Sequence, residues 1–346
     1  MKLSLKAARL PMRALTLALS LVAASGLWSG TAGAQSLAEA ARKEGKVVIY
    51  GSLESGIMDE IEKAFTKKYG VGIDYFRASS NKTLDRVLTE ARAGRSQSDV
   101  VVTNRGPMLL LKKENIFAKY VSPETANFPD NVKDPDGLLS PIYRMVIVGI
   151  LYNTKLVKPE DAPKSLDDLL GPKWKGKWVM PDPSRHFTTG VWLHNFDEIY
   201  GKDWLAFVKR MADSKPILAE SFIPSVQKVI SGEALAGITY IKYVYIFGKD
   251  GAPLDYVRLP QMLADGHHVG ITAKAPHPNA ARLFEDFFIS REGMQILARE
   301  GEFVTAKGLY PPIKGAESIK AIPMDEMSRD EYKKWSGEMR KLFVSK

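Results

Sequence analysis

The chain has 346 residues, with 49 Lys and Arg against 40 Asp and Glu, 45% hydrophobic and 10% aromatic residues, and no cysteine. This composition is that of a globular protein, and it excludes a disordered chain, a collagen-like repeat and a disulfide scaffold. Without any thiol, zinc–thiolate sites, thiol nucleophiles and a lipidated N-terminal cysteine are excluded as well.

The N-terminus has the pattern of a secretory signal peptide. An apolar stretch over residues 14–28 is followed by the small-x-small sequence Ala32-Gly33-Ala34, and four basic residues precede it: Lys2, Lys6, Arg9 and Arg13. The alternative is a membrane anchor, but the stretch is about 15 residues long and a bilayer needs roughly 20. We therefore expect a signal peptide over residues 1–34, cleavage after Ala34, and an exported protein.

Cleavage changes the charge and size of the chain. The leader carries four basic residues and no acidic ones, so its loss lowers the formal net charge from +9 to +5. The remaining basic residues are dispersed among acidic ones, which gives no support for nucleic-acid binding but is compatible with a small anionic ligand. No other stretch is apolar enough for membrane insertion after cleavage. The mature chain exceeds the size of one usual core, which predicts two domains.

The first part of the mature chain alternates strands and helices. Apolar runs predict strands at 46–51, 71–76 and 99–103, and helical periodicity predicts a helix over 57–69 that Gly70 ends and another that Gly94 ends. Strands that are apolar on both faces and separated by helices indicate a parallel sheet with helices packed on it.

A second unit of the same kind follows. The expected strands lie at 144–152, 177–180, 234–240, 256–259 and 269–274, and the expected helices at 189–200, 203–212, 225–230, 242–247, 279–289 and 291–299. No Gly/Ser-rich linker separates the two halves. We therefore expect the chain to cross between lobes in ordered strands.

The sequence has none of the common enzyme signatures. It contains no G-x-S-x-G, H-E-x-x-H, G-x-x-x-x-G-K-[ST] or strand-linked G-x-G-x-x-G motif. His267 and His268 are adjacent, so on a strand they would face opposite ways and could not share one metal ion. The sequence therefore favours binding over catalysis and predicts no cofactor.

Three loops at predicted strand ends carry the side chains of an anion site. Residues 51–55, 79–82 and 183–190 place small hydroxyl residues directly before helices, and two of these loops add a base, Lys82 and Arg185. Ligands of open α/β sheets bind outside the carboxyl ends of strands, where helix N-termini favour anions. Ordinary helix capping would use the same residue types, so each loop alone is open to that interpretation.

Tyrosines supply a second group of candidate residues. Tyr240 follows directly from a predicted strand, and Tyr243 and Tyr245 come soon after. A phenol at a strand end can donate to an anion, stack on a ligand ring or, when ionised, bind ferric iron. Tyr243 and Tyr245 could instead pack a helix against the sheet. Tyr240 is therefore the preferred candidate.

Several stretches from about Glu44 to about Phe303 form a recognisable series, among them "KEGKVVIYGS", "SDVVVTN", "DLLGPKWKGKW" and "KAPHPNAARLFEDFFISREG". These stretches resemble the periplasmic solute-binding proteins of ABC importers, in the ferric-iron-binding-like group, which also implies a periplasmic location. The resemblance implies the class II fold: two α/β lobes, each a mostly parallel sheet flanked by helices, joined by two crossover strands. Lobe 1 would comprise 35–142 and 260–346, and lobe 2 would comprise 143–259.

Relatives that bind ferric iron carry a histidine, a glutamate and two adjacent tyrosines at positions where this chain differs. The corresponding segments here are Ser52-Leu53-Glu54, Thr103-Asn104 and Tyr240-Ile241. Ferric iron requires several hard anionic oxygens, and only Glu54 and Tyr240 would supply them. Other members resemble carriers of phosphorylated or phosphonate-bearing organic molecules, thiamine or polyamines.

We therefore expect a periplasmic receptor that captures a small solute bearing a phosphate, phosphonate or carboxylate by hinge closure and delivers it to an ABC permease of the inner membrane. The expected ligand-binding residues are Ser52, Glu54, Ser79, Ser80, Asn81, Asn104, Arg185, Thr188, Thr189, Tyr240 and Tyr243. One alternative is a ferric-iron receptor using Glu54 and Tyr240. A further alternative is a secreted hydrolase using His186 with Glu54 or Tyr240.

Overall fold

The structure, a computed structural model, describes residues 28–345. The predicted basic and apolar parts of the leader, up to residue 27, lie outside this range. The first described helix, α2 (Trp28–Glu44), includes the expected cleavage site after Ala34. Among the described residues, no helix combines the length and apolarity that crossing a membrane requires.

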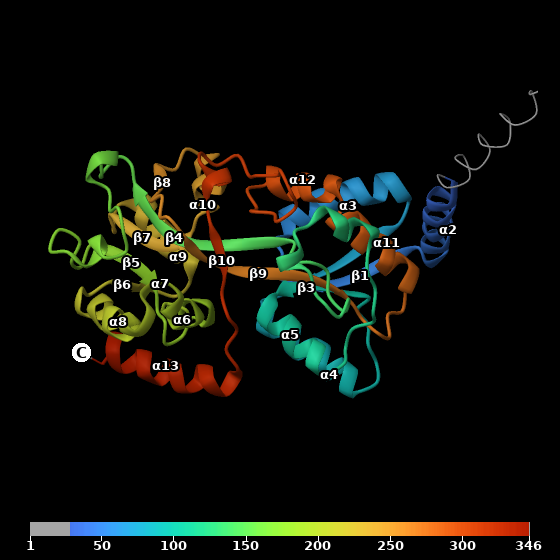
Figure 1. The fold of residues 1–346 in the computed structure, drawn as a ribbon, viewed down its shortest axis with the longest axis horizontal. Coiled ribbons are helices and arrows are strands. Elements are labelled where there is room, and N and C mark those ends of the chain that lie inside the picture. The colour runs from blue at the N-terminus through green and yellow to red at the C-terminus, as the bar shows by residue number, and fades with distance from the viewer. Residues whose placement is uncertain (1–27, 346) are drawn as a thin grey trace, which may run out of the picture.

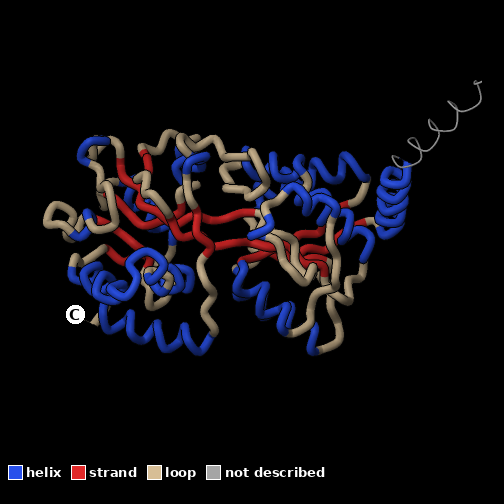
Figure 2. Tube along the Cα trace, viewed as in Figure 1, coloured by secondary structure: helices blue, strands red, loops and turns tan. Residues whose placement is uncertain are grey.

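Two lobes lie side by side and share one continuous sheet (Figure 1). Along the sheet the strand order is β2-β1-β3-β9-β4-β7-β5-β6, with β8 paired to β4 and β10 paired to β9. Within each lobe the outer strands are parallel and the inner strand, β9 or β4, is antiparallel to them. Helices cover the strands on the outside of both lobes (Figure 2). The predicted α/β fold with two lobes and two crossover strands is confirmed.

The N-terminal part of the chain builds the lobe on the right of Figure 1. Its strands are β1 (Lys46–Gly51), β2 (Gly72–Arg77) and β3 (Val100–Asn104), and its helices are α3 (Ser55–Tyr69), α4 (Ser80–Arg92), α5 (Arg105–Lys113), α11 (Pro278–Ile289) and α12 (Arg291–Arg299). Because the periodic patterns are local, the strands and the first two helices follow the prediction closely. Helix α5 was not predicted.

The second lobe contains β5 (Trp178–Pro181), β6 (Ile217–Ala219), β7 (Ala236–Tyr240) and β8 (Leu254–Tyr256), with α6 (Phe187–His194), α7 (Asp197–Tyr200), α8 (Trp204–Asp213), α9 (Phe222–Ser231) and α10 (Tyr243–Gly248). The helix predicted over 189–200 is divided into α6 and α7, and at the break the Asn195 side chain bonds the carbonyl of Val191 and the backbone of Asp325. Asn195 thus connects the end of α6 to the C-terminal segment.

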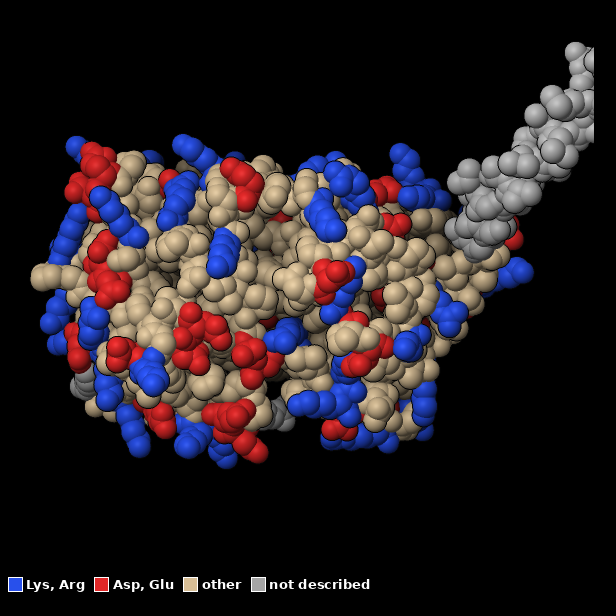
Figure 3. Space-filling view, viewed as in Figure 1, with Lys and Arg blue, Asp and Glu red and all other residues tan. Residues whose placement is uncertain are grey.

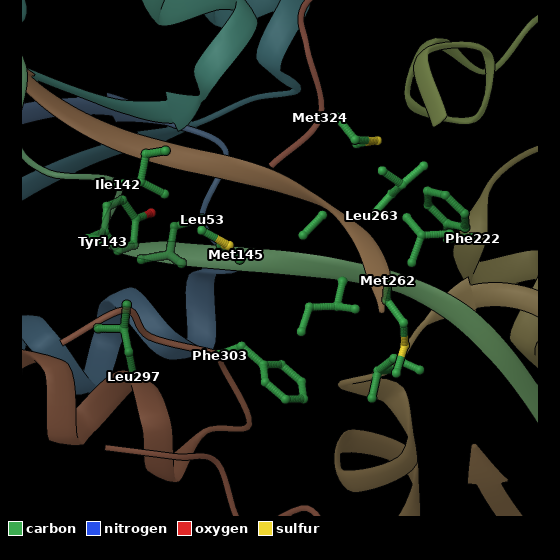
Figure 4. Packing of buried hydrophobic residues seen from close by; sticks show 14 of the residues in the cluster. Leu53, Ile142, Tyr143, Met145, Phe222, Met262, Leu263, Leu297, Phe303 and Met324 are labelled. Atoms are coloured by element: carbon green, nitrogen blue, oxygen red, sulfur yellow. The ribbon is translucent and has the colours of Figure 1, made fainter. Parts of the chain in front are cut away.

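The two crossover strands are β4 (Arg144–Asn153) and β9 (Met262–Ile271), and every residue of both is buried. They pair antiparallel between Arg144 and Ile147, and each continues into one lobe. Buried apolar side chains line them in Figure 4, among them Met145, Met262 and Leu263. The sequence predicts a strand only at 269–274, because polar residues interrupt the apolar run before it. In the structure, pairing with β3 and β4 extends this strand back to Met262.

Helix α3 illustrates how local sequence sets the elements. Its buried residues Ile57, Met58, Ile61 and Phe65 form one face, and Gly70 ends the helix with φ 69° while its N–H bonds the carbonyl of Thr66. Glycine adopts this left-handed conformation without the steric cost that other residues pay. The predicted helix stop at Gly70 is therefore confirmed.

The C-terminal segment departs from the predicted division into lobes. The expectation assigned all of 260–346 to lobe 1, but α13 (Arg329–Phe343) packs against α6 and α8 of the other lobe (Figure 1). Trp335 Nε1 donates to the carbonyl of Gly190 at 2.8 Å, and Ser336 Oγ donates to that of Ser184 at 2.7 Å. The preceding strand β10 (Ala321–Pro323) pairs with β9. The chain thus returns across the sheet and anchors the loop before α6.

Candidate functional site

The candidate site lies where the parallel strands of both lobes end. In lobe 1, β1 leads to Ser52 and Glu54, β2 to Ser79, and β3 ends at Asn104; in lobe 2, β7 ends at Tyr240. The strand order β2-β1-β3 places the reversal of connection between β1 and β3, where ligands of open α/β sheets bind. The residues predicted at separate strand ends therefore lie together at one place in the fold.

Two adjoining cavities occupy this location. One, of about 190 Å³, is lined by Ser52, Glu54, Arg77, Ser79, Ser80, Asn104, Arg144, Val146, Thr188, Tyr240, Lys242 and His267. The other, of about 330 Å³, is lined by Ser79, Ser80, Asn81, Asn104, Pro107, Arg185, His186, Phe187, Thr188, Val191, Asp265, Met324 and Glu326. We call them the basic cavity and the acidic cavity. Because they share Ser79, Ser80, Asn104 and Thr188, they form one cleft with walls from both lobes.

A buried ion cluster forms one wall of the basic cavity. Lys242 Nζ lies 2.6 Å from Glu54 Oε1 and 2.8 Å from Glu302 Oε1, and Arg144 Nη1 lies 2.7 Å from Glu302 Oε1 and 3.3 Å from Glu54 Oε2. The Arg144, Lys242 and Glu302 side chains are at most 3% exposed. Arg144 Nη2 also lies 3.3 Å from His267 Nδ1. The cluster connects Glu54, which follows β1, and Arg144, at the start of β4, to Lys242, which follows β7, and Glu302, which follows α12.

Burial and charge act in opposite directions on Glu54. Burial alone would raise the pKa of its carboxyl, but Lys242 and Arg144 together hold it well below its usual value. Arg144 stays charged, because the neighbouring carboxylate of Glu302 raises its pKa in spite of burial. Its Nε and Glu302 Oε2 are buried polar atoms without a hydrogen-bond partner. Arg144 and Lys242 thus stay charged beside the cavity, and the carboxylates of Glu54 and Glu302 balance their charge.

Tyr240 forms another part of the wall. Its ring packs on Phe222 with centroids 4.2 Å apart, and Lys242 Nζ lies 6.0 Å from its centroid. Burial, with a smaller effect of Asp265, raises the pKa of the phenol well above its usual value. At neutral pH Tyr240 is therefore a hydrogen-bond donor and not a phenolate.

A chain of polar contacts connects the two cavities. Ser52 Oγ lies 2.9 Å from Thr103 Oγ1, Ser80 Oγ donates to Asn104 Oδ1, and Asn104 Nδ2 donates to Asp265 Oδ2. Burial raises the pKa of Asp265 to about 7, against a lowering effect of the Asn104 hydrogen bond. Burial and the nearby Asp265 raise the pKa of Glu326 to about 8. The acidic cavity thus holds two carboxyls that burial keeps from ionising fully.

Nine of the predicted ligand-binding residues line this cleft: Ser52, Glu54, Ser79, Ser80, Asn81, Asn104, Arg185, Thr188 and Tyr240. Ser79 also accepts from the backbone of Lys82, so it caps α4 as the alternative interpretation expected. Two other predicted residues lie behind the wall. Thr189 is buried with its Oγ1 on His186 Nδ1, and Tyr243 is buried between the rings of Tyr240 and Phe247. Both side chains are used in packing.

His186 lines the acidic cavity and caps helix α6. Its Nδ1 lies 2.8 Å from Thr189 Oγ1 and accepts from the backbone of that residue, so it caps α6. Burial lowers its pKa to about 4, so the ring is neutral at physiological pH. The hydrolase alternative required His186 to act with Glu54 or Tyr240, whereas Glu54 is paired with Lys242 and Arg144.

Several residues of the cleft were not predicted: Arg77, Arg144, Lys242, Asp265, His267 and Glu326. A sequence signal existed for Arg144, because it begins the apolar run of a fully buried strand, where an unpaired cation would be costly. For Lys242 the signal was its position two residues after Tyr240, which was itself a candidate. Glu326 carries no such signal, since it reaches the cleft only through the return of the C-terminal segment.

The described residues contain no group of three or more His, Asp or Glu side chains arranged to hold a metal ion. Glu54 and Tyr240, the pair considered for ferric iron, do line one cavity. The carboxylate of Glu54 is already bound by two cations, and the phenol is protonated. These residues fit an anion better than a cation.

Residues 60–330 match the family of bacterial extracellular solute-binding proteins. The chain is 24% identical over 301 residues to the Fe(3+)-binding periplasmic protein of Serratia marcescens, covering 84% of this chain and 86% of that protein. It is 30% identical over 146 residues to a probable ABC transporter periplasmic-binding protein of Sinorhizobium fredii, covering 40% of each. The periplasmic binding protein AfuA of Actinobacillus pleuropneumoniae, solved with fructose 6-phosphate bound, has a similar structure, with a TM-score of 0.66 at 22% identity over 87% of this chain and 96% of that chain.

The fold and the cleft between its lobes are those of a solute-binding protein. The chain belongs to the family of bacterial extracellular solute-binding proteins. It is a solute-binding component of an ABC transporter, in the ferric-iron-binding-like group, as the resemblance of its sequence predicted.

Proposed function

We propose that the protein is a periplasmic receptor that binds a small solute through a phosphate, phosphonate or carboxylate group and delivers it to an inner-membrane permease. The observation that carries this proposal is the basic cavity. Arg77, Arg144 and Lys242 face it together with hydroxyl donors from both lobes. The groups around the basic cavity have a net positive charge, because Arg77, Arg144 and Lys242 outnumber the carboxylates of Glu54 and Glu302.

Helix dipoles support the same ligand class. The helices α3, α4, α5 and α6 all begin at residues that border the cleft, and each has at least eight residues. A helix N-terminus presents unpaired N–H groups and partial positive charge, which favour an anion. Their convergence adds to the basic side chains.

We further propose that binding closes the two lobes. The cleft has walls from both lobes, and within residues 28–345 the chain passes between the lobes through β4, β9 and the C-terminal segment. A ligand that contacts both walls binds the closed arrangement better than the open one and shifts the population toward it. The closed form is then the state that a permease recognises.

The proposal is tested by ligand-dependent thermal stability and isothermal titration calorimetry on the processed protein. The probes are inorganic phosphate, ethyl phosphate, glycerol 3-phosphate, methylphosphonate, citrate and ferric citrate. A ligand at 100 times its Kd stabilises the folded state by about 2.7 kcal/mol, which raises the Tm by a few degrees. The proposal is overturned if no anion of the panel shifts the Tm.

A matched pair of substitutions locates the site. Arg77 is exposed and lines the basic cavity, whereas Arg92 is exposed in the last turn of α4, about 18 Å along the helix from Ser80. We expect Arg77→Gln to weaken anion binding at least tenfold and Arg92→Gln to leave it unchanged. Equal effects of the two variants would show a general charge effect instead of a site.

Ferric iron is the second candidate, because a relative is an Fe(3+)-binding periplasmic protein and Glu54 and Tyr240 share one cavity here. Iron bound by Tyr240 would give a visible phenolate-to-iron absorption band in the ferric citrate arm. Loss of that band in Tyr240→Phe would support iron. The two cations on Glu54 lead us to expect no such band.

A further inference from the structure

The acidic cavity has a composition that a simple anion does not explain. It contains the carboxyls of Asp265 and Glu326, and no ion pair to either of them is present among the described residues. Asp265 is only 7% exposed, and its described hydrogen-bond donor is the neutral amide of Asn104. Glu326 accepts from the backbone N–H of Gly106, and its carboxyl lies where a side chain at that glycine would be. Buried carboxyls without a cation are costly to ionise.

The nearby cations do not neutralise this pair. The charges of Arg144 and Arg105 lower the pKa of Asp265 and that of Arg105 lowers the pKa of Glu326, but burial outweighs them. Arg105 Nη1 instead donates to the carbonyl of Met324 at 3.1 Å. The Arg185 side chain is 74% exposed and lies 3.7 Å from Asp182. A positive group on the ligand would supply the missing partner.

The strands β4 and β9 set the separation between the two ends of the cleft. Asp265 lines the acidic cavity and His267, which contacts Arg144, lines the basic cavity. They are two residues apart on β9 and so share one face, about 7 Å from each other. The facing residues on β4 are Val146 and Arg144. The cationic end and the acidic end of the cleft are therefore close enough for one small ligand to contact both.

The wall of the acidic cavity also has an apolar part. Pro107, Phe187, Val191 and Met324 line it beside the two carboxyls. This surface suits a short hydrocarbon segment that joins two charged ends. A neutral hydroxyl in the same place would leave the carboxyl pair without a counter-charge, and the described residues hold no third ligand for a metal ion there.

We propose that the receptor selects a small zwitterionic solute, in which the oxyanion group binds in the basic cavity and a primary ammonium group, a short aliphatic chain away, binds between Asp265 and Glu326. This inference rests on the proposed function and narrows its ligand class. The ammonium group donates to the two carboxyls and neutralises the charge that they carry in its presence. Glu326 is then a specificity-determining residue supplied by the C-terminal segment.

Calorimetry at pH 7.5 on the full processed protein tests this proposal with two probes that share the ethyl phosphate skeleton and differ by one amino group. O-Phosphoethanolamine carries the ammonium group and ethyl phosphate lacks it. We expect the wild type to bind O-phosphoethanolamine at least tenfold more tightly than ethyl phosphate. In Glu326→Gln and Asp265→Asn we expect the ratio of the two affinities to fall below threefold. Asp325→Asn is the control, since Asp325 is exposed and adjacent in sequence, and it should keep the wild-type ratio.

The outcomes separate this inference from the proposed function. Equal binding of the two probes by the wild type overturns the ammonium site and leaves the anion receptor standing, as does binding of inorganic phosphate or citrate without binding of either probe. A wild-type ratio that survives in Glu326→Gln also overturns it, and this variant serves if Asp265→Asn does not fold. Failure of every anion to bind overturns both proposals.

Discussion

Lys242→Met tests whether the buried ion cluster supports both the fold and the site. Lys242 is 3% exposed, and its ammonium bridges Glu54 and Glu302 at 2.6 and 2.8 Å. The substitution shortens the side chain by one atom and removes the charge. Among the described residues, Glu302, which is 1% exposed, then retains Arg144 at 2.7 Å as its counter-charge.

The expected loss of stability is substantial. Removing one partner of a buried ion pair costs about 3–5 kcal/mol, because the other charge stays buried without it. Arg144 still compensates part of the charge of Glu302, so we expect about 3 kcal/mol. A domain is stabilised by about 5–15 kcal/mol in total, so the variant should fold but unfold at a clearly lower urea concentration.

Urea unfolding at pH 7.5 measures this difference, and Lys249→Met is the matched control. Lys249 pairs with Glu300 at 3.1 Å, but both side chains are largely exposed, at 43% and 36%. An exposed pair contributes less than about 1 kcal/mol. The reasoning is refuted if the two substitutions cost the same, or if Lys242→Met costs less than 1 kcal/mol.

The pH dependence of the same comparison gives a second check. The folded pKa of Glu54 lies below its unfolded value of about 4.3, because Lys242 and Arg144 favour the carboxylate over the effect of burial. The stability from this pairing is therefore present above about pH 4.3 and is lost as the pH falls through the folded pKa. The difference between wild type and Lys242→Met should shrink below about pH 4, and a difference that widens there would contradict the assignment.

Three other substitutions test the core and the two ends of the cleft. Phe65→Ala should cost about 3–5 kcal/mol in urea unfolding, because Phe65 is fully buried against Phe284 and Phe287; a loss below 1 kcal/mol would argue against this packing. Asp265→Asn should gain about 3 kcal/mol relative to wild type between pH 4 and pH 8, since a raised folded pKa near 7 makes the wild type lose stability as the pH rises, and a flat difference would show that Asp265 ionises normally. Tyr240→Phe should weaken anion binding about tenfold by calorimetry and change the stability by less than about 1 kcal/mol, because it removes one donor and keeps the contact with Phe222; unchanged affinity would remove Tyr240 from the site.

Much of the fold could be predicted because its signals are local. The apolar runs of β1 and β3, the helical face that ends at Gly70, and the buried strand after Arg144 follow from periods of two and 3.6 residues and from glycine's freedom at positive φ. The positions of polar residues at strand ends were enough to select nine residues that line the cleft. The placement of α13 on lobe 2 could not be predicted, because nothing in its local pattern states which lobe it contacts.

The directions of the side chains decided which predicted residues reach the candidate site, and the sequence does not give these directions. Thr189 and Tyr243 lie next to cleft residues in sequence, yet each turns into the protein, because neighbouring residues of a helix start point in different directions. The sequence alone predicted a secreted protein, and it determined the two-lobe α/β fold and the hydroxyl-rich loops at its strand ends. Only the tertiary structure brought Arg144, Lys242 and Glu302 into one buried cluster and carried Glu326 across to Asp265. These groups are far apart along the chain, and charges interact through space at distances that sequence spacing does not record.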